Sequence, residues 1–204
     1  INLATTYHAG RFFQPRSPRR KTYFPEDGTI YFQPDAQLWA DRAIVPKVAD
    51  LVAEQGDVLR SLIQQRDRTG LSVACWTVCL HNTRLGLLHP GACTRNAFGD
   101  PNYYSLCPSH PDVRAYATTL VRDQTRSYRP EIVQLESPGF MRYHHGYHHE
   151  TDGVGLTPED DFLLSLCFCD ACGQRAALAK VDARAAQRTV RAWIEESAGG
   201  AVPA

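Results

Sequence analysis

The ten residues Leu71–Leu80 read LSVACWTVCL, an almost unbroken run of apolar and β-forming side chains. A strand with this composition is buried on both faces, which is typical of a parallel sheet covered by helices. Two further segments, INLATTY at 1–7 and EIVQLE at 131–136, also read as strands. We therefore predict three strands in the first two thirds of the chain.

Each predicted strand is followed, after a loop, by a segment with a helical pattern. Asp57 is placed to cap an apolar stripe that ends at Gly70, and Pro111 opens a second helix with one apolar face. Thr157-Pro158 begins a third helix, and an Ala-rich helix then continues to about Glu196. This strand, loop and helix order is typical of β/α units with right-handed crossovers.

The loops after the predicted strands are long, polar and rich in aromatic residues, notably 8–34 and 81–107. In a barrel such loops gather on the C-terminal face, where active sites lie. No strand is followed by a Gly-rich phosphate loop, which disfavours a nucleotide-binding doubly wound sheet. The predicted fold class is α/β, a partial (β/α)8 TIM barrel forming one domain over residues 1–204, with a frayed tail at 198–204. Three units cannot close a barrel of eight, so we expect a truncated chain.

The charge balance restricts the partners. The 204 residues carry 22 basic and 22 acidic side chains, scattered along the chain, so no nucleic-acid partner is expected. No apolar run approaches the roughly 20 residues of a membrane span. The seven cysteines are an odd number, and reduced or metal-bound thiols suit a cytoplasmic location. Assembly into a homo-oligomer stays open.

Three cysteines lie within six residues, in the order Cys167-Phe-Cys169-Asp-Ala-Cys172. Zinc prefers four soft ligands in a tetrahedron, and Cys107 is the best fourth candidate because it lies on the same loop face. Cys93 stays possible, whereas Cys75 and Cys79 read as small core residues. A redox pair and plain free thiols are the alternatives. We predict a structural Zn²⁺ site, since four-sulfur sites are closed and do not catalyse.

Glu136 closes the third predicted strand and should point into the mouth of the barrel. Glycoside hydrolysis uses two carboxylates that flank the scissile bond, one of them as proton donor. Glu136 is the candidate for that donor, and an ion pair with arginine is its alternative role. No second carboxylate has a matching placement, which a truncated barrel would explain.

The stretch from Ser105 to Trp193 resembles the barrel centre of the zinc-containing β-galactosidase family of retaining glycoside hydrolases, within the wider class of TIM-barrel glycoside hydrolases. The similarity rests on Cys107-Pro108 before a helix, a strand ending in Gln134-Leu-Glu136, and the Cys167 to Cys172 cluster. It implies that the four cysteines bind zinc and that Glu136 is the acid/base. The family has an asparagine, which helps to bind the sugar, where this chain has Leu135.

Histidines and aromatic residues follow all three strands, and the loop after Glu136 reads RYHHGYHHE at 142–150. Sugar hydroxyls need hydrogen bonds and sugar faces stack on rings, so these side chains favour a carbohydrate ligand. Trp76, in the middle of a strand, reads as core. The predicted substrate-binding residues are Tyr7, His8, Arg11, His81, Asn82, His144, His145 and His149.

Three functions follow from these patterns. The first is a glycoside hydrolase or transglycosidase with Glu136 as general acid/base. The second is an inactive carbohydrate-binding or scaffold barrel, which Leu135 and the missing second carboxylate favour. The third is a hydrolase with a catalytic zinc on the loop histidines.

Overall fold

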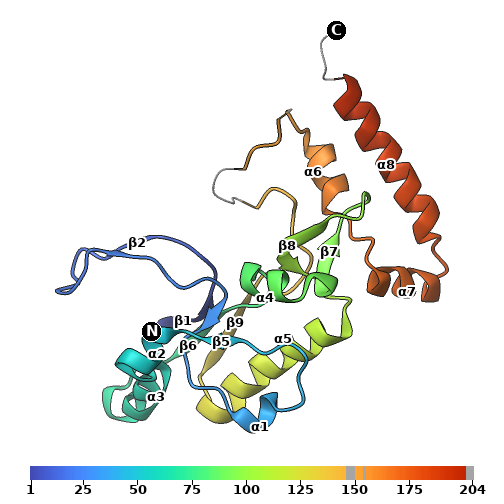
Figure 1. Cartoon of the computed structure of the whole chain (residues 1–204). Helices are drawn as coiled ribbons and strands as arrows, with labels where there is room; N and C mark the ends of the chain where they lie inside the picture. Colours follow the sequence, from blue (N-terminus) through green and yellow to red (C-terminus); the bar gives the residue numbers. More distant parts are fainter. Residues whose placement is uncertain (146–149, 154, 201–204) are drawn as a thin grey trace.

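The computed structural model describes residues 1–145, 150–153 and 155–200 (Figure 1). Its centre is a five-stranded sheet in the order β5-β4-β1-β6-β9. The strands β1 (Asn2–Tyr7), β6 (Ala74–Val78) and β9 (Ile132–Glu136) run parallel and side by side, which confirms the three predicted strands. The short β4 (Thr29–Ile30) is antiparallel to β1, and β5 (Lys47–Val48) pairs with β4.

The sheet is mixed and open over the described residues. Thus the α/β class and the parallel strands are confirmed, whereas the closed barrel stays a prediction. The strand β9 pairs only with β6 among the described strands, and Ile132 and Leu135 are exposed by 58% and 45% on it. No helix in the part of the chain that the structure describes is long and apolar enough to cross a membrane.

The main core lies between the sheet and the helices α3 (Val58–Thr69) and α5 (Pro111–Asp123). The predicted helix starts are confirmed: Asp57 accepts a hydrogen bond from the amide of Arg60 at 2.9 Å, and Pro111 stands in the first turn of α5. A π-helical turn, η2 (Gln124–Tyr128), extends α5. The short helices α1 (Ala36–Trp39) and α2 (Asp50–Gln55) lie between β4 and α3 in the chain.

The two long loops predicted from the sequence contain regular structure, so this prediction was wrong. Residues 8–34 include the hairpin of β2 (Phe12–Phe13) and β3 (Thr22–Tyr23). Residues 81–107 hold α4 (Thr83–Leu88), the 3₁₀ turn η1 (Pro90–Ala92) and the hairpin of β7 (Cys93–Arg95) and β8 (Pro101–Leu106). Gly86 makes this packing possible, because a Cβ there would lie 1.8 Å from the carbonyl oxygen of Tyr103.

Three C-terminal helices lie beyond the β7–β8 hairpin, away from the sheet (Figure 1). In α6 (Pro158–Ser165) Thr157 and Asp160 form a capping box, as the predicted cap requires. The prediction of a single Ala-rich helix was wrong. Lys180, with φ of 59°, lies between α7 (Asp170–Leu178) and α8 (Ala183–Gly200). The helix α8 continues past the predicted start of the tail at 198, and residues 201–204 lie outside the described residues.

Candidate active site and metal centre

The ends of the three parallel strands bring together residues that are far apart in the sequence. Tyr7 ends β1 with His8 after it, His81 follows β6, and Glu136 ends β9. The His8 ring stacks on that of Tyr7 at 4.5 Å and on that of His81 at 4.3 Å between centroids. Because parallel strands present their C-terminal ends at one edge, this grouping follows from the topology.

The loop after β9 adds His145 to this group. Its Nε2 lies 3.1 Å from Nδ1 of His81, so one ring donates a hydrogen bond to the other. The Tyr104 ring of β8 stacks on His145 with centroids 5.8 Å apart and an interplanar angle of 14°. We call Tyr7, His8, His81, Tyr104 and His145 the ring cluster.

Glu136 is held by a residue that the sequence assigned to the core. Trp76 Nε1 donates a hydrogen bond to Glu136 Oε2 at 2.6 Å, and the indole lies edge-on to Tyr7 at 5.6 Å. Trp76 is half-buried on the sheet face opposite to the helices, so its assignment to the core was wrong. Side chains alternate along β6, and the neighbours Cys75 and Thr77 are both buried on the helix-covered face. Trp76 must therefore lie on the opposite face.

Burial keeps the central histidines neutral. Burial first, and then the neighbouring His8 and His145, lower the pKa of His81 to about 3. Burial also lowers the pKa of His145, and burial together with the charge of Glu136 raises the pKa of Tyr7. Neutral imidazole offers one donor and one acceptor nitrogen, so these rings can pair with hydroxyl groups in either direction.

The other predicted binding residues have different surroundings. Asn82 caps α4 by accepting from Leu85 N at 2.8 Å and donates to Gly28 O at 3.3 Å, so its side chain serves the scaffold. Arg11 is exposed just before β2. His144 faces Asp152, whose carboxylate lies 2.8 Å from Nε2 and raises the pKa of the ring. His149 lies outside the described residues.

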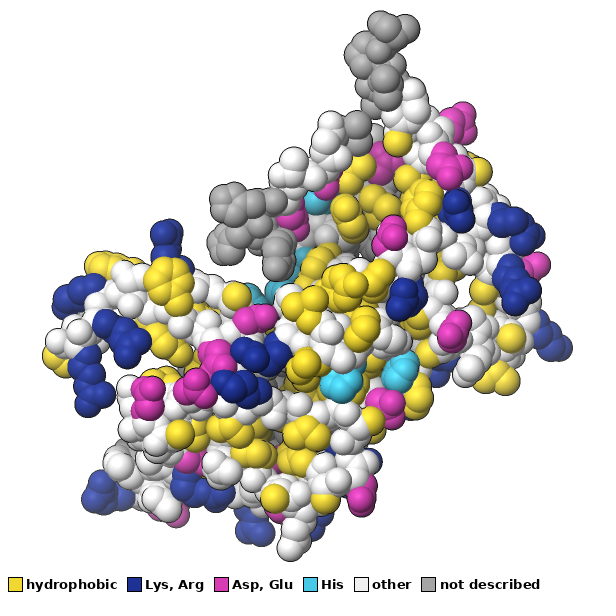
Figure 2. Space-filling model, viewed as in Figure 1, with side chains coloured by type: hydrophobic (Ala, Val, Ile, Leu, Met, Phe, Trp, Pro, Cys, Tyr) yellow, Lys and Arg dark blue, Asp and Glu magenta, His cyan; other side chains and the backbone are white. Residues whose placement is uncertain are grey.

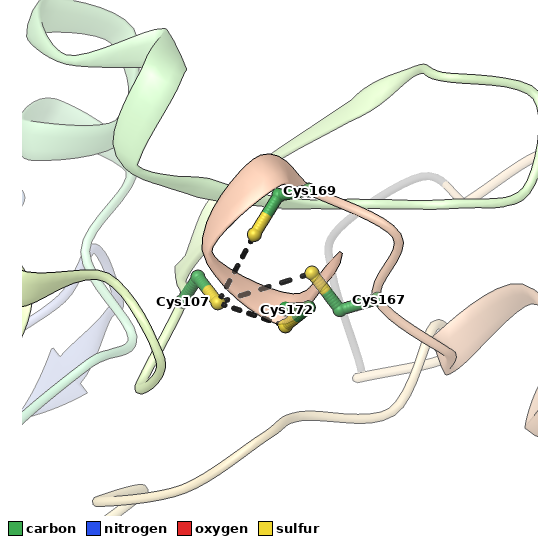
Figure 3. Close-up of side chains that lie close together, drawn as sticks. All are labelled: Cys107, Cys167, Cys169 and Cys172. Carbon is green, nitrogen blue, oxygen red and sulfur yellow. Dashed lines mark hydrogen bonds between the residues drawn. The ribbon is translucent and has the colours of Figure 1, made fainter. Parts of the chain in front are cut away.

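The four predicted zinc ligands form a compact cluster, with all four Sγ atoms within 4.8 Å of one another (Figure 3). Cys107 Sγ lies 3.5 Å from those of Cys169 and Cys172 and 3.9 Å from that of Cys167. Tetrahedral zinc with bonds of about 2.3 Å places its sulfur ligands about 3.8 Å apart. The donor set and its spacing therefore fit a metal such as zinc.

The remaining thiols are not part of this cluster. The nearest acceptors of Cys93 Sγ are the carbonyl oxygens of Gly86 and His89, and Cys75 and Cys79 are buried in the main core. Among the described residues no second set of three potential metal ligands comes as close together as the four cysteines. In the ring cluster the nitrogens of His81 and His145 lie close together, but these are two potential ligands and a set needs three.

No protein-family model and no curated protein matches the chain. One solved structure, alpha-L-fucosidase isoenzyme 2 from Paenibacillus thiaminolyticus, aligns with 79% of this chain at 18% sequence identity and a TM-score of 0.45. The aligned part is 21% of the fucosidase chain, so the protein spans about a fifth of that length. A similarity this remote assigns neither a fold nor a reaction.

Proposed function

We propose that the chain is part of a carbohydrate-active (β/α)-barrel protein in which Glu136 transfers a proton at a glycosidic bond. The observation that carries this proposal is the hydrogen bond from Trp76 to Glu136 beside the ring cluster. A group of aromatic rings with a few oriented polar groups is what a sugar needs, because ring faces stack and hydroxyls pair with donors and acceptors. A barrel would place this face of the sheet inside, as the exposed edge of β9 allows.

The geometry gives Glu136 a defined orientation. Oε2 accepts the hydrogen bond from the Trp76 indole, so Oε1 is the oxygen that can carry a proton to the leaving group. Neutral His81 and His145 would then bind sugar hydroxyls, while the rings of Tyr7 and Trp76 offer apolar surfaces for stacking. In this proposal a structural Zn²⁺ held by the four cysteines supplies rigidity and takes no part in the reaction.

The test is hydrolysis of a panel of aryl glycosides by the protein and its Glu136→Gln variant. We expect turnover to fall by at least about 100-fold, because the amide cannot donate the proton. Glu131→Gln, at the other end of the same strand and paired with Arg66, is the matched control and should keep activity. Equal turnover in Glu136→Gln and the unaltered protein would refute the role of Glu136.

A second candidate is a barrel that binds sugar without cleaving it. It is favoured by Leu135, which lines a hollow with Val121 and Pro138 beside α5 and gives the ring cluster no polar group. Sugar binding without turnover across the panel would support this candidate. A hydrolase with zinc on histidines would instead bind a second metal ion per chain, which metal analysis after loading measures directly.

A further inference from the structure

A second hollow lies next to the ring cluster, between α4, the β7–β8 hairpin and α6. Its volume is about 480 Å³, within the range of small-molecule sites. We call it the tyrosine pocket, after its three tyrosines. The residues that line it include Tyr103, Tyr104, Tyr143, Leu87, Asn102 and Asp100. Figure 2 shows hydrophobic side chains gathered on the surface over α4 and β8.

Tyr104 joins the tyrosine pocket to the candidate active site. Its ring stacks on His145 and also lines the pocket, while its hydroxyl donates to the carbonyl oxygen of Arg142 at 2.9 Å. The Tyr143 amide donates to Ser165 Oγ at 2.7 Å, which fixes the opposite wall. These two contacts hold Tyr104 and the backbone at Tyr143 in place, which lowers the cost of ordering this part of the wall when a ligand binds.

The lining favours an uncharged, hydroxyl-rich ligand. The hydroxyl groups of Tyr103 and Tyr143 have no hydrogen-bond partner within the described ranges, so they are available to a ligand. Asn102 and Asp100 add polar groups beside the apolar surfaces of Leu87 and the rings. Among the described residues that line the pocket there is no Lys or Arg, which disfavours a phosphate or another anion.

We infer that the tyrosine pocket is a second sugar subsite, so that the ligand is an oligosaccharide of at least two residues. This inference rests on the proposed function and extends it. One sugar residue would lie against the ring cluster beside Glu136, and the next would pass Tyr104 and stack on Tyr103. An aromatic ring can bind the face of a sugar by stacking, and this contact needs no charged group on either partner.

The test measures binding of methyl hexopyranosides, and of disaccharides that end in the same hexose, to the Glu136→Gln protein by calorimetry. We expect the disaccharide to bind about tenfold more tightly, and Tyr103→Ala to remove this gain while methyl hexoside binding is kept. Leu88→Ala is the matched control, because Leu88 is exposed on α4 and does not line the pocket. Tyr103 is itself 42% exposed, so thermal unfolding should show both variants folded.

The outcomes separate this inference from the proposed function. If aryl glycosides are hydrolysed but disaccharides bind no better than methyl hexosides, the subsite is refuted and the function stands. If no glycoside is hydrolysed but Tyr103→Ala still removes a gain in disaccharide binding, the subsite stands and catalysis is refuted. A gain that survives in Tyr103→Ala places the second sugar elsewhere and overturns the inference.

Discussion

The sheet region and the three C-terminal helices are held together in different ways. The sheet packs on α3 and α5 through a large apolar cluster that includes Leu59, Cys75 and Tyr116. The helices α6 to α8 share a much smaller cluster, in which Ala97, Val190 and Ile194 are the buried members. Hydrophobic burial can therefore account for the stability of the first region, whereas we expect the second to need a metal ion held by the four cysteines.

The second region nevertheless bears on the candidate active site. The Tyr143 amide bonds to Ser165 of α6, and the His144 amide donates to Asp161 of α6 at 2.7 Å. These bonds anchor the segment that brings His145 to His81. The strand-end residues are therefore positioned by the sheet, whereas the position of His145 depends on contacts with α6.

The largest expected effect comes from removing one ligand of the cysteine cluster. With Cys107→Ala, or after chelation, we expect amides of α7 and α8 to lose hydrogen-exchange protection, because metal binding by such sites supplies several kcal/mol of local folding energy. Amides of β6 should stay protected. Cys75→Ala, which removes a buried thiol outside the cluster, is the control. Equal loss of protection in β6 and in α7 and α8 would show that the two regions do not differ in their dependence on the cysteines.

Next in size is an effect confined to the sheet region and its hairpin. Gly86→Ala places a methyl group 1.8 Å from the carbonyl oxygen of Tyr103, and we expect it to cost about 3 kcal/mol in the free energy of unfolding. Gly91→Ala is the control, since nothing lies within 4 Å of its added Cβ. Urea denaturation measures both. Similar stability of the two variants would show that α4 and β8 can separate at low cost.

A pH dependence located at the ring cluster should have a smaller effect for each pH unit. The folded pKa of His81 is lowered from 6.5 to about 3, so the unfolded chain binds more protons in that window. Stability should therefore fall as the pH drops from about 6.5 towards 3, by about 1 kcal/mol per pH unit.

Urea denaturation across that range checks the dependence with two variants. His81→Gln should flatten the slope. The pKa of His144 is raised, so its stabilisation is fully present below about pH 6.5 and is lost only as the pH rises above that value. His144→Gln should therefore lower the stability within the range but leave the slope unchanged. An unchanged slope in His81→Gln would mean that the ring is solvated in the folded protein.

The smallest expected effect is local to α6. Thr157→Ala removes the hydroxyl that accepts from the Asp160 amide, and we expect a loss of about 1 kcal/mol, visible as faster hydrogen exchange in the first turn of α6. Thr118→Ala, an exposed position within α5, should be close to neutral. If α6 exchanges no faster in Thr157→Ala, contacts with α8 hold it without its cap.

The sequence predicted the features that depend on local pattern or on simple topology. The apolar run 71–80 predicted a buried strand, and the spacing of Cys167, Cys169 and Cys172 predicted that these thiols lie together. The position of Glu136 at the end of its strand likewise placed it at the edge where the strands meet.

What the sequence missed depends on contacts between distant segments. The strands of the β7–β8 hairpin are short, and their packing on α4 at Gly86 is visible only in three dimensions. Trp76 was assigned to the core because a run of apolar residues does not show which face the helices cover. Asn82 looked like a binding residue, but the start of α4 directly after it makes it a cap.

The unpaired side of β9 affects the solubility of the protein. Along one side of this strand the backbone amides and carbonyls have no neighbouring strand among the described residues, next to the exposed side chains of Ile132 and Leu135. An uncovered sheet margin of this kind is a template for strand addition, both by a proper neighbour and by other molecules of the same chain. Solubility should thus improve when a covering segment is supplied, and aggregates of the chain alone should be rich in intermolecular β-structure.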